Sequence, residues 1–367
     1  MSLVERLAEL VSFDTQNPMG DERPLLRKLA GDLQALGAAS VDLEIVGETR
    51  GYVYARFGGG SPRLLLNAHV DTVPANTGYT TAPHQLVTRG DRLVGLGSAD
   101  TKGAIAAILE TLAALRAQGR EPNQPIGVLF SGDEEKGGSC IRAFLDSAHA
   151  RGFQHAQALA IVCEPTGCRV GRRHRGIGAA ELGAVGPGGH SSLVDGLDNP
   201  IAILARAAVA LDDMGIAARA QGPEGFRGIC LNVAGITGGI AFNVIPTQAT
   251  LMLSVRPAPG TPVAAVLAEA EQRARRATAP HPVTWTVHAD RPGFATRDLA
   301  SFEPLLGAPV GKPVDLGFWT EAALLSERGI DAVVFGPGDV GQAHAADEHV
   351  TLADLETAQA AFTRALT

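Results

Sequence analysis

Histidine and acidic side chains that could bind a metal ion stand at five points of this sequence. The first point holds His69 and Asp71. Alternate residues of an extended segment face the same side, so this imidazole and this carboxylate can lie together. A histidine ligand held by a carboxylate has this pattern. The alternative is a histidine in an ordinary surface loop, because the tripeptide alone carries little information.

The second and third points are Asp100 and the acidic run 133–135. Asp100 comes directly before an Ala- and Leu-rich stretch that predicts a helix, so it is either the N-cap of that helix or a ligand at its start. Three consecutive acids repel one another unless solvent or bound cations relieve the repulsion. The run is therefore either a solvated turn or a pair of working glutamates, Glu134 and Glu135, that divide the duties of ligand and base.

The fourth and fifth points are Glu164, directly after Cys163, and His344, shortly after the segment 336–338. Each alone fits an ordinary loop, and Cys163 fits a small buried side chain better than a thiolate ligand. One ligand from each of the five points gives two imidazoles and three carboxylates, which suit a pair of Zn²⁺-type ions that share one aspartate and a bridging water. The predicted ligands are His69, Asp100, Glu135, Glu164 and His344.

Apolar runs precede most of these side chains and predict the strands that position them. The runs are 64–69, 126–130, 158–162 and 332–335, and they alternate with helical patterns, the strongest at 102–118. This alternation predicts an α/β fold with a largely parallel sheet. Ligands of such sheets bind beyond the carboxyl ends of the strands, where the candidate residues stand.

The pattern changes between residues 177 and 288. Two helices and two strands are predicted there, at 199–213, 261–276, 229–236 and 248–255. The last segment alternates apolar and polar residues, as a strand with one covered face does. We therefore expect a metal-binding α/β domain and a smaller inserted α+β domain, with bounds 1–176 plus 289–367 and 177–288, respectively.

The composition excludes several classes of protein. A length of 367 residues fits two or three domains of about 150 residues, and 45% hydrophobic with 19% charged residues fits a folded protein. A net charge of −8 opposes nucleic-acid binding. Four scattered cysteines fit a reducing cytoplasm. The charged N-terminus does not fit a signal peptide, and Pro246 and the glycines of run 228–255 favour paired strands over a membrane span.

Seven motifs follow one another along nearly the whole chain. They are Asn67–Pro74, Gly95–Gly103, Ser131–Glu135, Glu164–Thr166, Gly189–Ser192, Asn243–Pro246, and Gly336–Gly338 with His344. This ordered set resembles the co-catalytic zinc metallopeptidase and deacylase family of acetylornithine deacetylase, succinyl-diaminopimelate desuccinylase and aminoacylase. Segments 314–322 and 344–348 are most similar to its acetylornithine and acetylcitrulline deacetylase branch.

The resemblance implies how the metal ligands are shared. His69 and Glu164 would hold one divalent ion, Glu135 and His344 the other, and Asp100 would bridge them. The ions would be Zn²⁺, with Co²⁺ or Mn²⁺ as substitutes that use the same donors.

The resemblance also implies roles around the ions. Asp71 would orient the histidine ligand, and Glu134 would be the general base. His190 would polarise the scissile carbonyl, unless it is a plain loop histidine. Arg256 and Asn243 would grip the α-carboxylate of the substrate, unless the arginine forms only a surface ion pair.

The reaction implied is hydrolysis of an N-acyl amino acid, N-acetylornithine or N-acetylcitrulline, in a cytoplasmic homodimer formed through the inserted domain. Alternatives with the same site are a dipeptidase, a carboxypeptidase or a succinyl-diaminopimelate desuccinylase. A metal-containing binding protein without catalysis is opposed by the intact Glu134. A serine hydrolase lacks its G-x-S-x-G motif here. Segment 319–321 departs from the Thr-Asp of many relatives, which leaves the acyl preference open, and the basic run 172–175 either faces solvent or attracts an anion.

Overall fold

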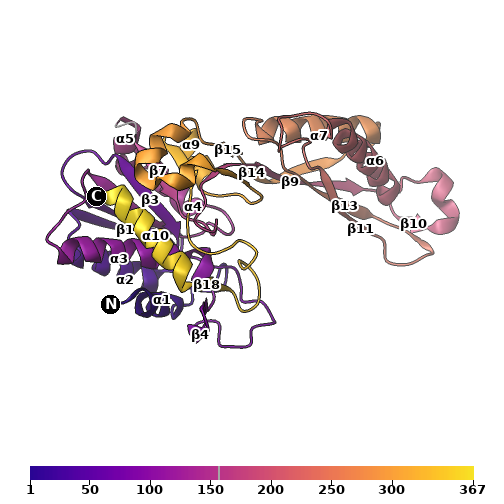
Figure 1. Cartoon of the computed structure of the whole chain (residues 1–367). Coiled ribbons are helices and arrows are strands. Elements are labelled where there is room, and N and C mark those ends of the chain that lie inside the picture. The colour runs from indigo at the N-terminus through magenta and orange to yellow at the C-terminus, as the bar shows by residue number, and fades with distance from the viewer. Residues whose placement is uncertain (156–157) are drawn as a thin grey trace. The chain divides into compact units, whose positions relative to one another are not determined.

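The chain folds into two compact units in the computed structural model, which describes residues 1–155 and 158–367 (Figure 1). Unit 1 comprises Met1–Arg172, Thr296–Val314 and Thr320–Thr367, and unit 2 comprises Arg173–Ala295 and Asp315–Trp319. The chain thus passes between the units a few residues away from the predicted borders at 176 and 289. The short segment 315–319, which the sequence did not assign to the insert, also belongs to unit 2.

A mixed sheet forms the centre of unit 1. Within unit 1, its strands run in the order β1-β2-β6-β3-β7-β17. Their bounds are β1 (Ser40–Val46), β2 (Arg50–Phe57), β6 (Ile126–Ser131), β3 (Leu64–His69), β7 (Leu159–Val162) and β17 (Asp331–Val334). β6, β3, β7 and β17 are mutually parallel, and β1 and β2 add an antiparallel edge. This arrangement confirms the predicted α/β class with a largely parallel sheet.

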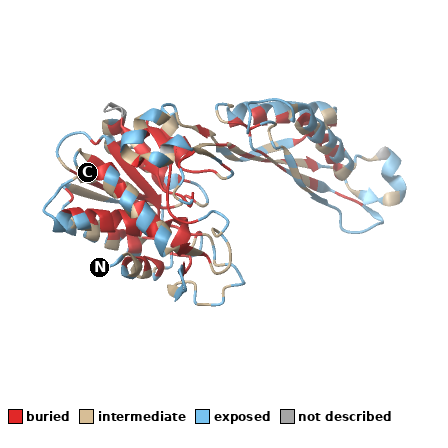
Figure 2. Ribbon diagram, viewed as in Figure 1, coloured by how far each residue is buried: buried red, intermediate tan, exposed pale blue. Residues whose placement is uncertain are grey.

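The parallel strands are buried along nearly their whole length (Figure 2). Strands that are covered on both faces read as continuous apolar runs, which is why the sequence pattern identified them. Helix α3 (Gly103–Ala117) is also largely buried. It ends as the sequence predicted, because Gly119 takes the left-handed backbone conformation, with φ +64°, that stops a helix.

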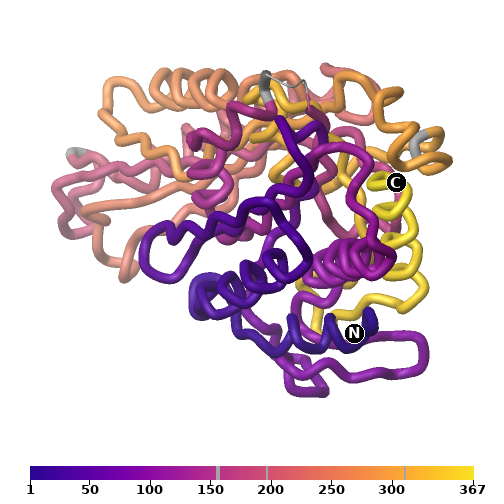
Figure 3. The backbone as a smooth tube through the Cα atoms, turned by 90° about the vertical axis from the view of Figure 1, so that its left-hand side faces the viewer, coloured from indigo at the N-terminus to yellow at the C-terminus, as the bar shows by residue number. Residues whose placement is uncertain are grey.

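Helices from both ends of the chain pack against α3. They are α1 (Leu3–Val11) and α10 (Leu352–Leu366), which also contact each other (Figure 3). A capping box between Ser2 and Glu5 begins α1. Residues far apart in sequence are therefore joined to one core. The other helices of unit 1 are α2 (Arg23–Ala35), α4 (Ser139–Asp146), α5 (Ala148–His155), α8 (Glu303–Leu306) and α9 (Ala322–Glu327).

The remaining short strands lie in unit 1 and in the segments where the chain passes from one unit to the other. A small antiparallel sheet consists of β4 (Val87–Arg89), β5 (Arg92–Val94) and β18 (His349–Thr351). The segments that cross from one unit to the other include β8 (Gly171–His174), which pairs with β15 (Phe294–Ala295) and β16 (Val314–Leu316). The small sheet matters for the site, because β18 comes directly after the loop that carries His344.

Unit 2 has a four-stranded antiparallel sheet with two helices on one face. The sheet has the order β11-β13-β9-β14. The bounds are β11 (Asn232–Gly238), β13 (Gln248–Val255), β9 (Ile177–Val185), β14 (Thr284–Arg291), α6 (Pro200–Ala218) and α7 (Val263–Thr278). Alternate residues of β13 are buried, in agreement with the period-two pattern. Its pairing with β11 confirms that the uncharged run 228–255 forms two strands rather than a membrane span.

Candidate metal centre

The parallel strands of unit 1 bring the predicted ligands to one edge of the sheet. His69 is the last residue of β3, Glu135 follows β6, Glu164 follows β7, and the loop after β17 carries His344. Because these strands are parallel, their carboxyl ends share one edge. Asp100 arrives from the turn before α3.

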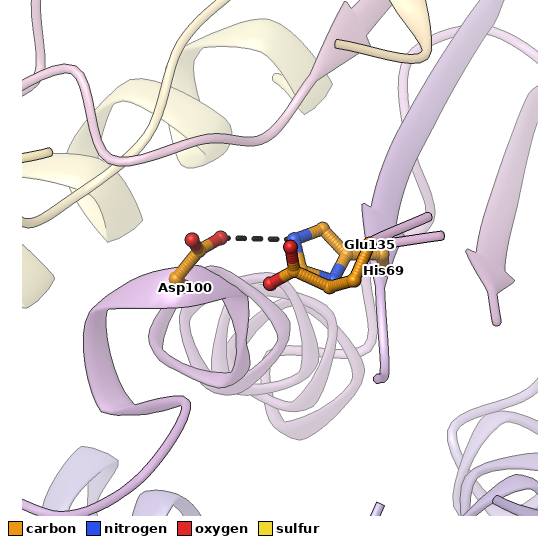
Figure 4. Close-up of side chains that lie close together, drawn as sticks. All are labelled: His69, Asp100 and Glu135. Atoms are coloured by element: carbon orange, nitrogen blue, oxygen red, sulfur yellow. Dashed lines mark hydrogen bonds and ion pairs between the residues drawn. The ribbon is translucent and has the colours of Figure 1, made fainter. Parts of the chain in front are cut away.

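Asp100 lies between two imidazoles. Its Oδ1 is 2.9 Å from Nε2 of His69, and its Oδ2 is 3.4 Å from Nε2 of His344. The same His344 nitrogen is 3.1 Å from Oε1 of Glu135. One donor atom each of His69, Asp100 and Glu135 lie within 4.8 Å of one another (Figure 4).

The alternative of Asp100 as a helix cap is wrong. Its backbone, with φ −124° and ψ 84°, is not helical, and Lys102 is the residue at the N-cap position of α3. The carboxylate contacts His69 and His344 instead of the first amides of the helix. The two carboxylate oxygens of Asp100 can therefore each bind a different positively charged group.

Glu134 and Glu164 are buried beside this group. Neither side chain forms a hydrogen bond or ion pair with residues in the described ranges 1–155 and 158–367. Desolvation raises the pKa of both carboxyl groups well above the usual value, and the charge of Glu135 adds to the effect on Glu134, as that of Asp100 does on Glu164. Neighbouring carboxylates repel one another when they are ionised together. A bound cation would relieve this repulsion.

The histidines carry the opposite shift. Hydrogen bonds to Asp100 and Glu135 raise the pKa of His344 to about 10. Burial opposes protonation of His69, but its bonds to Asp100 and Asp71 outweigh burial and raise its pKa. Bonds from both imidazoles likewise outweigh burial at Asp100 and hold its pKa below the usual range. Positive charge is thus favoured at this position, and imidazole with carboxylate donors fits divalent ions of the Zn²⁺ type.

Asp71 forms hydrogen bonds with the main chain of two glutamates and contacts His69. Its Oδ1 accepts the main-chain N–H of Glu134 at 3.1 Å, and its Oδ2 accepts that of Glu135 at 3.2 Å. His69 Nδ1 is 3.5 Å from Oδ1 and 3.0 Å from the main-chain oxygen of Asp71. The aspartate therefore orients the histidine partly through its backbone, and it also positions both glutamates.

Asn17 is a site residue that sequence reasoning missed. Its Nδ2 donates to Asp71 Oδ2 and to Asp133 Oδ1, at 3.0 Å each. The Asn-Pro pair at 17–18 signals a turn, but nothing in that signal points to a partner 54 residues away.

A second missed contact lies under the sheet edge. Ser131 Oγ donates to Oε2 of the buried Glu321 at 2.6 Å, and Asn67 Nδ2 donates to Ser131 Oγ at 3.1 Å. Desolvation raises the pKa of Glu321 to about 7. The departure from the Thr-Asp pattern at 319–321 thus places a carboxyl group in a polar network beneath the site.

The other predicted residues lie in unit 2. His190 and Asn243 are both exposed, and the pairing of His190 with Val244, together with the bond from Ser191 N–H to Asn243 O, brings them to one end of the unit. Arg256 is exposed just beyond the opposite end of β13. Eight residues of strand span about 26 Å at roughly 3.3 Å per residue, so the structure does not bring Arg256 next to Asn243.

Two of these side chains have atoms free for a ligand. His190 Nδ1 accepts the N–H of Ser192 at 3.2 Å, which leaves Nε2 as the protonated donor. The guanidinium of Arg256 has no hydrogen bond or ion pair with any residue that the structure describes. The surface ion pair that would explain Arg256 without a substrate is therefore not formed.

Other sequence features have structural explanations. In the basic run, Arg173 pairs with Asp315 at 2.7 Å, and Arg175 donates to three main-chain carbonyls of unit 2. Burial raises the pKa of the Cys163 thiol, which opposes a thiolate ligand. Within the described part of the chain, no helix has both the length and the apolar character of a membrane span.

The comparisons with known proteins agree with this geometry. Residues 65–367 match the model of peptidase family M20/M25/M40. The chain is 35% identical to N-acetyl-L-citrulline deacetylase of Xanthomonas campestris pv. campestris, over 97% of this chain and 94% of that protein. It is 32% identical to acetylornithine deacetylase of Myxococcus xanthus, over 98% and 95% of the two chains.

Its fold is similar to that of a solved structure, the M20 family metallo-carboxypeptidase Sso-CP2 from Sulfolobus solfataricus. The TM-score is 0.80 at 18% identity, and the match covers 100% of this chain and 98% of that one. The family resemblance of the ordered motifs is thus confirmed. The chain belongs to peptidase family M20/M25/M40 and is a metal-dependent amidohydrolase.

Proposed function

We propose that the chain deacylates N-acyl amino acids, with N-acetylcitrulline and N-acetylornithine as its substrates. The observation that carries the proposal is the position of Asp100, with one oxygen toward each of His69 and His344 at the carboxyl edge of the sheet. The 35% identity to N-acetyl-L-citrulline deacetylase over nearly the whole length supports the substrate class.

The metal site in this proposal consists of His69, Asp100, Glu135, Glu164 and His344. Two imidazoles and three carboxylates suit two divalent ions, with Zn²⁺ as the first candidate and Co²⁺ or Mn²⁺ as substitutes. Such ions polarise a carbonyl and activate water at neutral pH. Asp71 supports the site by holding the main chain of Glu134 and Glu135.

Glu134 is the general base of the proposed reaction. It takes a proton from the attacking water and returns it to the leaving amine nitrogen. Two features support this role: the carboxylate is buried, and it forms no hydrogen bond within the described residues that would occupy it. Its raised pKa suits a group that must both accept and release a proton.

Residues of unit 2 recognise the substrate in this proposal. His190 donates from Nε2 to the oxygen on which negative charge develops, and Arg256 and Asn243 bind the α-carboxylate. Because Asn243 and Arg256 lie at opposite ends of β13, one chain cannot place both on one small substrate. We therefore propose a cytoplasmic homodimer in which each site takes His190 and Asn243 from the second copy.

Mixed dimers test this arrangement. His190→Ala and Arg256→Ala are each expected to be nearly inactive, whereas a refolded mixture should recover activity. Each mixed dimer then contains one site in which both residues are intact. A mixture that stays inactive although native gels show mixed dimers would contradict the shared site.

A carboxypeptidase or dipeptidase is the second candidate, favoured by the fold similarity to Sso-CP2. A panel of N-acetylornithine, N-acetylcitrulline, N-succinyl-diaminopimelate and dipeptides, each assayed with metal-loaded protein, separates the candidates. The proposal expects the highest kcat/KM for an acetylated amino acid. Turnover of dipeptides or the succinyl compound without turnover of acetyl compounds would overturn it.

A further inference from the structure

Glu348 binds three main-chain amides of the turn that carries Asp100. The side chain is buried, with 2% of the residue exposed. Its Oε2 accepts the N–H of Gly97 at 2.8 Å, and its Oε1 accepts those of Ala99 and Asp100 at 2.9 Å each. One of the three amides is thus that of the proposed bridging ligand itself.

The turn needs such a partner because it is not a regular helix. Gly97 has φ +77°, and Asp100 and Thr101 depart from helical angles. The amides of Gly97, Ala99 and Asp100 belong to buried residues and bond to Glu348 instead of to helix carbonyls, so leaving one of these N–H groups unpaired would cost about 1 to 3 kcal/mol. On its other side the turn is tied to β3, since Thr101 Oγ1 donates to the main-chain oxygen of His69 at 2.8 Å.

The geometry of the contact favours a carboxyl group over an amide. Three N–H donors converge on two oxygens, so each oxygen acts only as an acceptor. A glutamine would turn its NH₂ group toward at least one of these donors, which removes a bond and places two donors face to face. The substitution Glu348→Gln therefore disturbs the turn, although it leaves the volume of the side chain unchanged.

Glu348 also links two proposed ligands. It lies four residues after His344, and its own main chain is held independently, since Gly95 N–H donates to Glu348 O at 2.9 Å and β18 pairs with β5. The segment can therefore stay in place when the carboxylate changes. A change of the Glu348 side chain should therefore alter mainly the position of Asp100 relative to His344.

We propose that Glu348 is a positioning residue that holds Asp100 between His69 and His344 and thereby sets the metal affinity of the site. The proposal rests on the proposed role of Asp100 as a ligand. Partners of metal ligands of this kind typically contribute 10- to 100-fold to metal affinity. Glu348 would act through the backbone of the ligand, without touching metal or substrate.

The test compares Glu348→Gln with Asp347→Asn. Asp347 is a matched control in the neighbouring position, because its carboxylate binds Thr80 and Arg89 rather than the Asp100 turn. Metal-free proteins are titrated with Zn²⁺ against a chromophoric chelator, and Co²⁺ spectra report the coordination. We expect Glu348→Gln to weaken metal binding 10- to 100-fold and alter the Co²⁺ spectrum, and Asp347→Asn to do neither.

Further variants separate the outcomes. Asp100→Asn must itself lose metal affinity; if it does not, the proposed ligand set fails. If Asp100→Asn loses affinity and Glu348→Gln keeps both affinity and spectrum, the positioning role alone is overturned. Glu348→Asp keeps the charge but shortens the reach, and we expect an intermediate loss. Failure of both Glu348 variants to fold, with Asp347→Asn folded, would also overturn it in favour of a role in stability.

Discussion

At the scale of single residues, neighbouring glutamates have different surroundings. Glu135 contacts His344, whereas the carboxylate of Glu134 has no such partner among the described residues. The two backbones are held by the same aspartate, so adjacent side chains are directed to different tasks. This difference underlies the assignment of one as ligand and the other as base.

Glu134→Gln should abolish most of the activity and spare the metals. Loss of a positioned proton carrier typically lowers kcat by 10²- to 10⁴-fold, while the amide keeps the shape of the side chain. Steady-state kinetics and metal analysis measure the two effects, with the exposed Glu356→Gln as the control. A variant that retains kcat within a few-fold of wild type would exclude Glu134 as the base.

Glu321 gives a pH-dependent prediction for stability. Its pKa is raised by burial to about 7, so the folded protein favours the neutral acid and loses stability as pH rises from about 4.5 to 7. Glu321→Gln mimics the neutral acid. We expect it to raise the Tm of metal-free protein by roughly 3 to 8 °C at pH 8 and by little at pH 5.

Calorimetry at both pH values tests this prediction. An equal Tm change at the two pH values would mean that ionisation of Glu321 is not involved. The surface variant Glu356→Gln controls for a general effect of removing one negative charge.

At the scale of elements, β13 links the proposed recognition residues of unit 2 to that unit's own core. Leu251 on this strand is fully buried, whereas the next residue, Met252, is 45% exposed on the other face. The core of unit 2 is separate from that of unit 1. A defect in this strand should therefore affect stability without affecting the metal centre.

Leu251→Ala is expected to destabilise the protein by about 2 to 5 kcal/mol, because it leaves a cavity in that core. Met252→Ala should change stability by about 0.5 kcal/mol or less. Urea unfolding measures both, and Zn²⁺ titration should give the wild-type affinity for both. A tenfold loss of metal affinity in Leu251→Ala would show that the two units are not independent.

At the scale of the whole molecule, the metal site gathers charge from distant parts of the chain. Asp100, Glu134 and Glu164 are buried and Glu135 is half-buried, in a chain of net charge −8. Their mutual repulsion opposes folding when no cation is present. Bound metal should accordingly stabilise the fold as well as enable the reaction.

Removal of metal is expected to abolish activity and lower the Tm, and Zn²⁺, Co²⁺ or Mn²⁺ should restore both. At free metal of 100 times Kd, the stabilisation is about 2.7 kcal/mol. Differential scanning calorimetry before and after chelation measures it, with Asp100→Asn as the control that should respond weakly. Activity that survives exhaustive chelation would contradict metal-dependent catalysis by this chain.

The sequence by itself determined the class of fold, the family and the set of candidate donors. These follow from local information: buried parallel strands read as apolar runs, and all the donors except Asp100 stand at or after the ends of those runs. Only the tertiary structure decided how the donors are held. Asn17 bonds to Asp71, which is 54 residues away, and Glu348 bonds to the main chain of Asp100, which is 248 residues away. The spacing of residues in the sequence does not predict such contacts. Their partners become adjacent only when the chain packs, which is the physical reason that the supporting residues escaped prediction.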